Sequence, residues 1–303
     1  MKTAIRLTCF FLLTATLCLS AKIIDPVNDA AYDRAMQAFD RQDWAAAVEG
    51  YTEALKHVPY MLAYINRASA YVGLGKYDEA IADFDAAILL VNDAHFSNIH
   101  FRYIFFNRGQ AYMGKKDFEK AIGDFSYIIS HTERSVPPYL LRGNCELQLG
   151  RLKEARHDLQ VVLKMSPRHL DANMLMLRLC LREGDAAATR RQLETVRDIV
   201  DKSPSVEFCD ALAWLMATAA DAKLRDGQQA VLYATKACEM CMWMRAKPVD
   251  TLAAACAETG DFANAIKWEQ DYLGREEPTG AEKQAAQARL DLFQRSLPYH
   301  EAD

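Results

Sequence analysis

A Cys-x-x-Cys motif, Cys238-Glu-Met-Cys241, is the stretch of this sequence most typical of chemistry. Such a pair can be a redox couple, half of a zinc site or a haem attachment. Haem attachment needs a histidine next, and the sequence has Met242 there. Zinc needs further ligands, but the seven histidines are scattered and unpaired. An exported thiol-redox or metal-binding protein stays an alternative function, although the motif falls at the end of a predicted helix, where the dipole does not favour a thiolate.

Four carboxylates gather within residues 74–88: Asp78, Glu79, Asp83 and Asp85. A catalytic pair of carboxylates must converge on a shared, partly dry cleft. The stretch has instead the apolar period of a helix, and its apolar positions are Ala80, Ile81, Phe84 and Ala87. If these face inward, the acids lie around the outer arc of the helix. We therefore predict that all four face water and take no part in catalysis.

No other pattern in the sequence points to an enzyme. There is no G-x-S-x-G elbow, phosphate-binding loop or H-E-x-x-H motif. The chain is 51% apolar and 25% charged, with a formal net charge of −5 and no run of lysine or arginine. This composition argues for a globular protein and against nucleic acid as a partner. We predict a non-enzymatic protein without catalytic residues, metal or cofactor.

Residues 1–21 have the pattern of a secretory signal peptide. Basic residues precede an uncharged stretch from Leu7 to Leu19, and small residues follow at Ser20 and Ala21. The stretch is short for a membrane span, and a lipid anchor on Cys18 is disfavoured by the bulky residue before it. We expect an exported protein, periplasmic or secreted, with no integral span in the mature chain. Six cysteines remain after cleavage, an even number that permits disulfides without establishing them.

The elements that carry these motifs repeat along the chain. Residues 64–88 and 105–129 share Asn-Arg-small-x-Ala-Tyr, then an aromatic residue, then Ala-Ile-x-Asp-Phe. Weaker copies occupy 31–55 and 139–163. One alanine anchors each copy, and the spacings between successive anchors are 33, 41 and 34 residues: Ala47, Ala80, Ala121 and Ala155. No segment has the period of a β-strand, so the sequence predicts an all-α fold.

The repeated pattern resembles the tetratricopeptide (TPR) family, whose period is about 34 residues. Around Ala80 the family's positions are filled by Ala68, Tyr77, Phe84 and Ala87. Small residues let the two helices of a pair approach, and larger residues fill the groove between their turns. Glycines after the first helix of a pair supply left-handed caps: Gly75, Gly150, Gly184 and Gly260. The resemblance implies a right-handed α-solenoid of about seven helix-turn-helix repeats, with the first helices (helices A) lining its concave face.

The predicted array divides into three parts. About five repeats fill residues 28–200, with an insertion near 92–101 and a degenerate fifth copy that has Thr189 at the anchor position. Residues 203–275 resemble a two-repeat module of bacterial TPR proteins. A helix over 279–297 begins with a capping-box spacing and has an apolar face formed by Ala285, Leu290, Leu292 and Phe293. We predict that this helix caps the array, which needs a covered end to stay soluble.

The resemblance also implies where a partner binds. In TPR arrays the inner face is built from positions of helix A that project away from the second helix. Carried over to this chain, these positions and their neighbours are Tyr32, Met36, Ile65, Asn66, Ser69, Tyr103, Phe106, Asn107, Gln110, Leu140 and Asn144. The family's carboxylate clamp is not expected, because Tyr32, Met36 and Tyr103 stand where its lysine, asparagine and other basic residues belong.

Apolar rings beside side-chain amides suit an extended or helical peptide, because the amides can pair with its backbone. We therefore expect an interaction scaffold of the bacterial cell envelope that binds a peptide or protein segment in the concave groove. A partner on the convex face or on the C-terminal helix is the remaining possibility. The identity of the partner is not encoded in such generic chemistry.

Overall fold

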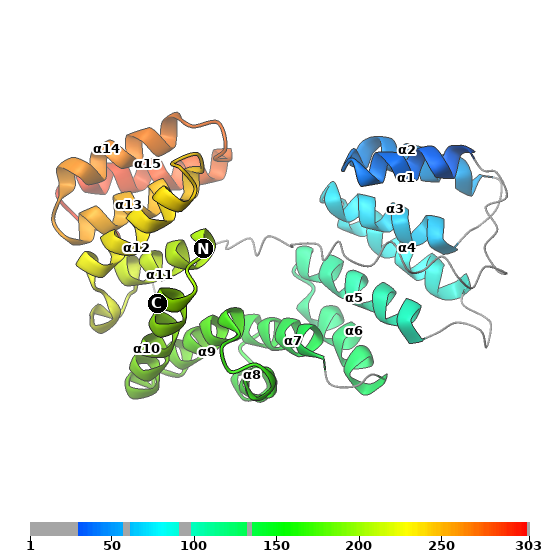
Figure 1. Ribbon diagram of the computed structural model, residues 1–303, viewed down its shortest axis with the longest axis horizontal. Coiled ribbons are helices and arrows are strands. Elements are labelled where there is room, and N and C mark those ends of the chain that lie inside the picture. Colours follow the sequence, from blue (N-terminus) through cyan, green and yellow to red (C-terminus); the bar gives the residue numbers. More distant parts are fainter. Residues whose placement is uncertain (1–29, 57–60, 91–97, 132–134, 302–303) are drawn as a thin grey trace. The chain divides into compact units, whose positions relative to one another are not determined.

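The structure is a computed structural model that describes residues 30–56, 61–90, 98–131 and 135–301. These residues form fifteen α-helices and one 3-10 helix, with no β-strand among them (Figure 1). The all-α prediction is confirmed. The predicted signal peptide, residues 1–21, lies outside the described residues, as does most of the insertion predicted near 92–101.

The chain forms two compact units, residues 1–161 and 162–303, called here the first unit and the second unit. The helices of the first unit are α1 (Ala30–Asp40), α2 (Trp44–Leu55), α3 (Met61–Gly73), α4 (Tyr77–Leu90), α5 (Asn98–Gly114), α6 (Phe118–His131), α7 (Val136–Gln148) and α8 (Leu152–Met165), whose last turn enters the second unit. Helix α5 begins inside the predicted insertion and is therefore longer than the other first helices of this unit.

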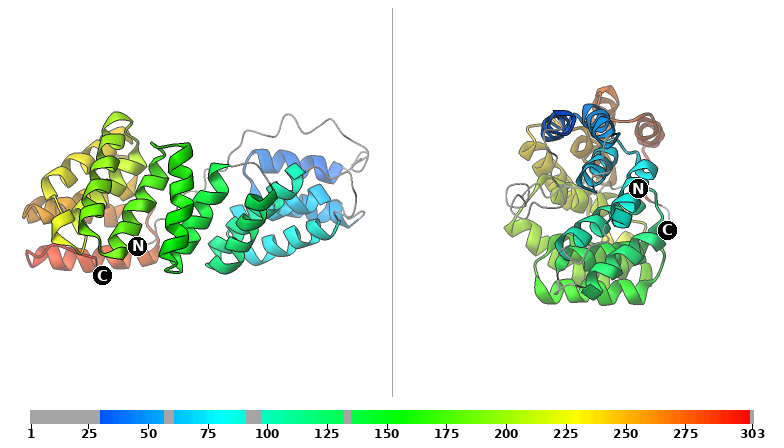
Figure 2. Two further views of the ribbon diagram at one scale, coloured as in Figure 1. Left: turned by 90° about the horizontal axis from the view of Figure 1, so that it is seen from below. Right: turned by 90° about the vertical axis from the view of Figure 1, so that its right-hand side faces the viewer.

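The helices of the second unit are α9 (Leu170–Glu183), α10 (Ala186–Lys202), α11 (Val206–Thr218), the 3-10 helix η1 (Ala222–Leu224), α12 (Gly227–Met240), α13 (Ala246–Glu258), α14 (Phe262–Gly274) and α15 (Gly280–Gln294). The helices of the described residues thus form seven successive pairs followed by α15, as predicted, and Figure 2 shows the pairs within each unit from two further sides.

The two helices of a pair pack closely around the anchor residue. The four predicted anchor alanines are completely buried, and Thr189 is buried at the fifth anchor position. The approach is close: a Cβ added to Gly50 on α2 would lie 2.7 Å from the Cβ of Ala35 on α1. Larger side chains then fill the remaining space, and Phe84 and Phe125 are fully buried. Small residues at the crossing are therefore what allow each pair to form.

A left-handed residue ends helix A in most pairs. Gly75, Gly150, Gly184 and Gly260 have φ values of 71°, 76°, 71° and 82°, which confirms the predicted caps. In the first and third pairs the same position holds Gln42, with φ 60°, and Lys116, with φ 63°. Side chains with a Cβ are strained in this conformation.

We expect Lys116→Gly to stabilise the protein by about 1 kcal/mol, because it relieves left-handed strain at an exposed position. Gly75→Ala should destabilise it by about 1 kcal/mol for the same reason, although an added Cβ there meets no neighbour. The shift in urea midpoint measures both changes. Equal destabilisation by both variants would show that backbone strain does not govern this turn.

The prediction that all four carboxylates of 74–88 face water is wrong for Asp83. Its side chain is buried, because both of its oxygens accept hydrogen bonds from Arg67 on α3, each at 2.7 Å. The exposed Asp78 pairs with Lys115, and the half-exposed Asp85 pairs with Arg108. Helical period alone placed Asp83 on the outer arc, but the arginine that binds it lies on the neighbouring helix.

The same two-point ion pair recurs in three successive repeats. Arg108 binds Asp124 at 2.9 and 2.6 Å, and Arg142 binds Asp158 at 2.7 and 2.8 Å, so that each arginine lies sixteen residues before its aspartate. The aspartates are buried and the arginines are mostly buried. Two-point geometry fixes the rotation of one helix against the other as well as their distance.

Each of these arginines also reaches the preceding repeat. Its remaining Nη1 donates to the second helix of that repeat: Arg67 to Thr52 Oγ1 at 3.0 Å, Arg108 to Asp85 Oδ1 at 2.5 Å, and Arg142 to Ser126 Oγ at 2.9 Å. Aromatic rings of the same helix flank the guanidinium, such as Phe105 with its centroid 4.9 Å from Arg108. One side chain therefore holds three helices together.

We expect Asp83→Asn to destabilise the protein by about 2 kcal/mol, because it leaves the largely buried Arg67 guanidinium without its counter-charge. The matched control is Glu79→Gln on the same helix, where the carboxylate is exposed, and its effect should stay within about 0.5 kcal/mol. Chemical denaturation of both variants tests this. Indistinguishable midpoints would show that the pair adds no net stability.

Helix α15 begins with the predicted capping box. The backbone N–H of Glu282 donates to Thr279 Oγ1 at 3.4 Å, and the N–H of Thr279 donates to Glu282 Oε2 at 2.8 Å. Leu290 and Phe293 are buried as predicted and Leu292 partly so. The predicted Ala285 is exposed, whereas its neighbour Ala286 is fully buried. The buried face of α15 therefore differs from the predicted one by including Ala286 in place of Ala285, and it also includes Arg289.

Candidate functional site

The predicted binding residues of the first unit form links between consecutive helices A. Asn66 Nδ2 on α3 donates to the hydroxyl of Tyr32 on α1 at 3.1 Å. The hydroxyls of Ser69 on α3 and Tyr103 on α5 lie 3.5 Å apart. Tyr32 and Asn66 lie at nearly equivalent positions of their repeats, whose anchors are 33 residues apart. Ser69 and Tyr103 belong to repeats whose anchors are 41 residues apart, so this link joins turns of α3 and α5 that are offset by about two helical turns. We call the predicted residues of α1, α3, α5 and α7 together the helix A surface.

The side chains of the helix A surface differ in how exposed they are. Tyr103 is 48% exposed and Met36 is 44% exposed. The half-buried members are Asn66, Ser69, Phe106, Asn107, Gln110 and Leu140. Tyr32, Ile65 and Asn144 are buried, so the expectation that they line an open groove is corrected. The reason is local packing, since the Tyr32 ring lies edge-on to Tyr51 at 5.4 Å and Asn144 is within 3.4 Å of Gln148 Nε2.

The open part of the surface centres on α5. Asn107 Nδ2 donates to the backbone carbonyl of Tyr103 at 2.7 Å, which fixes the amide beside the ring. The Phe106 ring packs edge-on against Phe125 at 6.1 Å and is held by α6. Tyr103, Asn107 and Gln110 therefore present a hydroxyl and two amides on a supported helix face. Neutral groups of this kind bind backbone N–H and C=O groups.

The Cys-x-x-Cys motif lies at the C-terminal end of α12. Cys238 is fully buried, and burial, together with Cys241, raises the pKa of its thiol to about 12. Cys241 is the C-cap residue and its Sγ donates to the carbonyl of Cys238 at 3.3 Å. All six described cysteines are free thiols. A thiolate is disfavoured here, both by burial and by the negative end of the helix dipole.

No group of three or more histidine, cysteine, aspartate or glutamate side chains in the described ranges could hold a metal ion. Within the same ranges, every helix is too short or too polar to cross a membrane.

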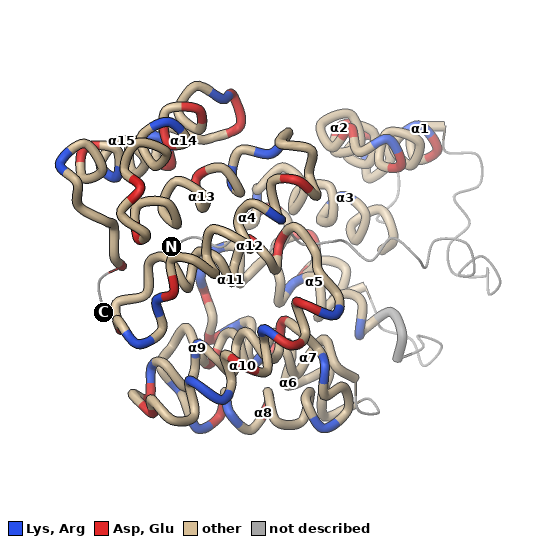
Figure 3. The backbone as a smooth tube through the Cα atoms, turned by 60° about the vertical axis from the view of Figure 1, so that its left-hand side comes forward, with Lys and Arg blue, Asp and Glu red and all other residues tan. Residues whose placement is uncertain are grey.

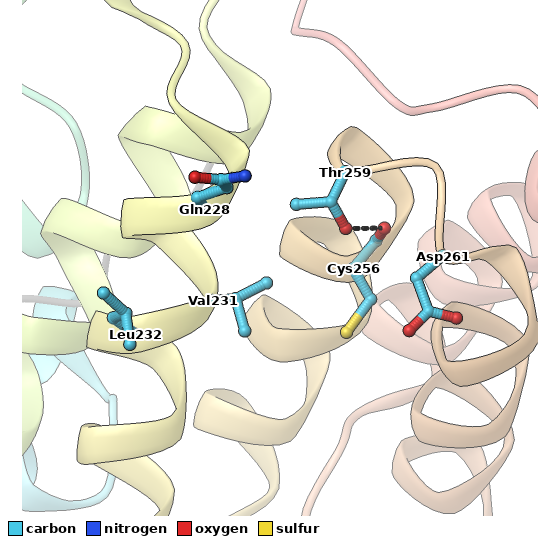
Figure 4. Close-up of a pocket in the computed structure, with 6 residues that line it drawn as sticks. All are labelled: Gln228, Val231, Leu232, Cys256, Thr259 and Asp261. Atoms are coloured by element: carbon cyan, nitrogen blue, oxygen red, sulfur yellow. Dashed lines mark hydrogen bonds between the residues drawn. The ribbon is translucent and has the colours of Figure 1, made fainter.

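A surface hollow of about 380 Å³ lies between α12 and the turn from α13 to α14 (Figure 4). Its lining residues are Gln228, Val231, Leu232, Cys256, Thr259 and Asp261. Two of its three polar lining residues are already used by the fold: Thr259 Oγ1 donates to the carbonyl of Cys256 at 2.8 Å, and Asp261 caps α14 by accepting from the N–H of Asn264 at 3.1 Å. The hollow therefore offers few groups that could orient a small molecule.

A buried charged cluster joins the last three helices of the second unit. Arg289 on α15 binds Asp250 on α13, and its Nε donates to Glu269 Oε1 on α14 at 3.1 Å. Burial and the neighbouring Asp250 raise the pKa of Glu269 to about 9. The acid therefore stays protonated at neutral pH while Asp250 is the counter-charge of Arg289. Sequence reasoning missed this cluster, because its three residues come from separate helices without a shared motif.

We expect the stability of the protein to fall as pH rises from about 4 toward 9, because unfolded glutamate, with a pKa near 4.3, releases a proton that folded Glu269 keeps. Glu269→Gln keeps the acceptor for Arg289 and should reduce this loss by about 2 kcal/mol or more. Urea denaturation at several pH values measures it. The exposed Glu276→Gln serves as control, and identical profiles for both variants would contradict the assignment.

Paired helices that approach closely at small anchor residues, with left-handed caps at a period near 34 residues, define a helical solenoid with a tetratricopeptide-type fold. Residues 32–95 match the family model described as tetratricopeptide repeat. No curated protein matches the chain by sequence.

Solved structures share the same architecture. A tetratricopeptide repeat protein from Parabacteroides merdae ATCC 43184 has a TM-score of 0.60 at 15% identity, over 87% of this chain and 97% of that chain. MamA, residues 41 to the end, from Desulfovibrio magneticus RS-1 has a TM-score of 0.52 at 15% identity, over 58% of this chain and 96% of that one. At these identities the likeness shows the fold alone, a tetratricopeptide-type solenoid.

Proposed function

We propose that the protein is a non-enzymatic scaffold of a bacterial cell envelope that binds a peptide or protein segment on the helix A surface of the first unit. The observation that carries this proposal is the contact between Ser69 and Tyr103, which joins α3 to α5 at an exposed aromatic ring. The envelope location rests on the signal-peptide pattern of residues 1–21.

The chemistry of the surface supports a neutral segment as its ligand. Tyr103 supplies an exposed ring of the kind that dominates binding energy at interfaces. Asn107 and Gln110 lie about one and two turns after it on the same helix and carry amide groups that can pair with a peptide backbone. Lysine and arginine are not members of this surface, so a ligand held chiefly by its carboxylates fits it poorly.

We expect the double variant Tyr103→Ala, Gln110→Ala to reduce partner capture at least about tenfold, because it removes the exposed ring and an amide while leaving the buried anchors intact. The purified chain is immobilised, exposed to the envelope fraction of the native cell, and the retained proteins are quantified by mass spectrometry against the wild type. Circular dichroism and the melting temperature check that the variant is folded.

The matched control is Lys153→Ala, Gln160→Ala, at two exposed positions of α8, the second helix of its pair. It should capture the same partner as the wild type. A partner retained equally by both double variants would overturn the proposed surface, and loss of capture only in the α8 variant would move the binding site to the second helices.

A further inference from the structure

The segment that follows α15 folds back onto α11 in the manner of a bound peptide. Helix α15 ends at Gln294, and Ser296, with φ 57°, turns the chain out of the helix. Residues 297–301 have no helical or strand structure. Figure 3 shows the backbone leaving α15 and running toward the end of the chain marked C. An extended segment lying across a helix needs specific contacts to stay there.

Backbone and side chain of Glu301 are both held by α11. Its N–H donates to the carbonyl of Thr218 at 2.8 Å, one of the carbonyls at the end of α11 that the helix itself leaves open. Its Oε1 accepts from Trp214 Nε1 at 2.7 Å. This pairing of one backbone and one side-chain contact is how grooves recognise extended peptides.

An aromatic contact lies two residues before this carboxylate. The Tyr299 ring is 6.2 Å from the Trp214 ring, and the Arg289 guanidinium lies 5.5 Å from the Trp214 centroid and 5.8 Å from that of Tyr299. Between the two anchors, His300 Nε2 lies 2.7 Å from Glu258 Oε2 at the end of α13. The recognised pattern is therefore an aromatic residue, one intervening residue and a carboxylate.

A cation on α9 acts on Glu301. Arg178 on α9 is half-buried and interacts electrostatically with both Glu301 and Arg182. Burial and Arg182 lower the pKa of Arg178, whereas Glu301 raises it. An anion at the position of Glu301 is thus favoured by Arg178.

We propose that this surface of the second unit, formed by Arg178, Trp214, Thr218 and Glu258, is a peptide-binding site that segment 298–301 occupies in cis. Its partner is a protein segment of the same chemistry, with an aromatic residue two positions before a carboxylate. The partner gains access by displacing the segment, which raises the concentration of partner needed. This site is separate from the helix A surface of the first unit and does not depend on the function proposed for it.

The test uses the full chain and a labelled peptide of residues 296–303, Ser-Leu-Pro-Tyr-His-Glu-Ala-Asp. In the wild type the tethered segment competes with the peptide at an effective concentration in the millimolar range. The variant Tyr299→Ala, Glu301→Gln weakens that competitor. We expect the variant to bind the peptide at least about tenfold more tightly than the wild type in fluorescence anisotropy. A control peptide carrying the same two substitutions should not bind either protein.

A folded variant that fails to bind the peptide would overturn the proposal, as would equal binding to wild type and variant. Exchange of segments between copies, seen as a concentration-dependent dimer in analytical ultracentrifugation, would assign the site to a second copy of this chain and contradict the proposed partner.

If the variant does not fold, hydrogen exchange on the unmodified chain tests whether segment 298–301 can leave its site. A displaceable segment should open without α15, so the Glu301 amide should exchange at least about tenfold faster than the amides of α15, yet slower than in the free peptide. Equal protection of Glu301 and α15 would show that the segment is an integral part of the fold, and the proposal would fail.

Discussion

The closeness of paired helices at their anchor residues is the constraint on which the rest of the structure depends. Completely buried alanines at Ala47, Ala80, Ala121 and Ala155 set how near two helices can come. Packing within a pair buries only the faces that the two helices turn toward each other. The remaining apolar surface of the pair is buried by stacking on the neighbouring pair. The turns of helix A that take part in neither contact stay exposed, and exposed residues such as Tyr103 are available there for binding.

The two units add charge to this packing in different ways. In the first unit Arg67, Arg108 and Arg142 each hold an aspartate of their own pair and a side chain of the preceding one, which repeats the same device along the array. In the second unit one arginine, Arg289, serves two buried acids and two aromatic rings where the array ends. A buried guanidinium is tolerated in both because a carboxylate supplies its counter-charge at hydrogen-bond distance.

Much of the fold could be predicted from the sequence, because anchor alanines, capping glycines and the Thr279–Glu282 box are local signals with a fixed spacing. The burial of Asp83 could not be predicted in this way, because helical period concerns one helix only, whereas Arg67, the partner of Asp83, lies on another helix. The recurring arginine and aspartate sixteen residues apart were a readable signal. The burial of Tyr32 and Asn144 could not be predicted either. Their positions in the repeat indicate which way each side chain points from its helix, but not which side chains cover it. The fold-back of Glu301 onto Trp214 has no local signal, because 87 residues separate them.

The central claim is that a protein segment binds along the helix A surface around Tyr103. Site-specific photo-crosslinking in the native cell tests it most directly, with a benzophenone amino acid replacing Tyr103, which is 48% exposed, or the exposed Lys153 on α8. The account predicts a discrete crosslinked partner from position 103 and none from position 153. Crosslinks to the same partner from position 153 alone, with none from position 103, would contradict it.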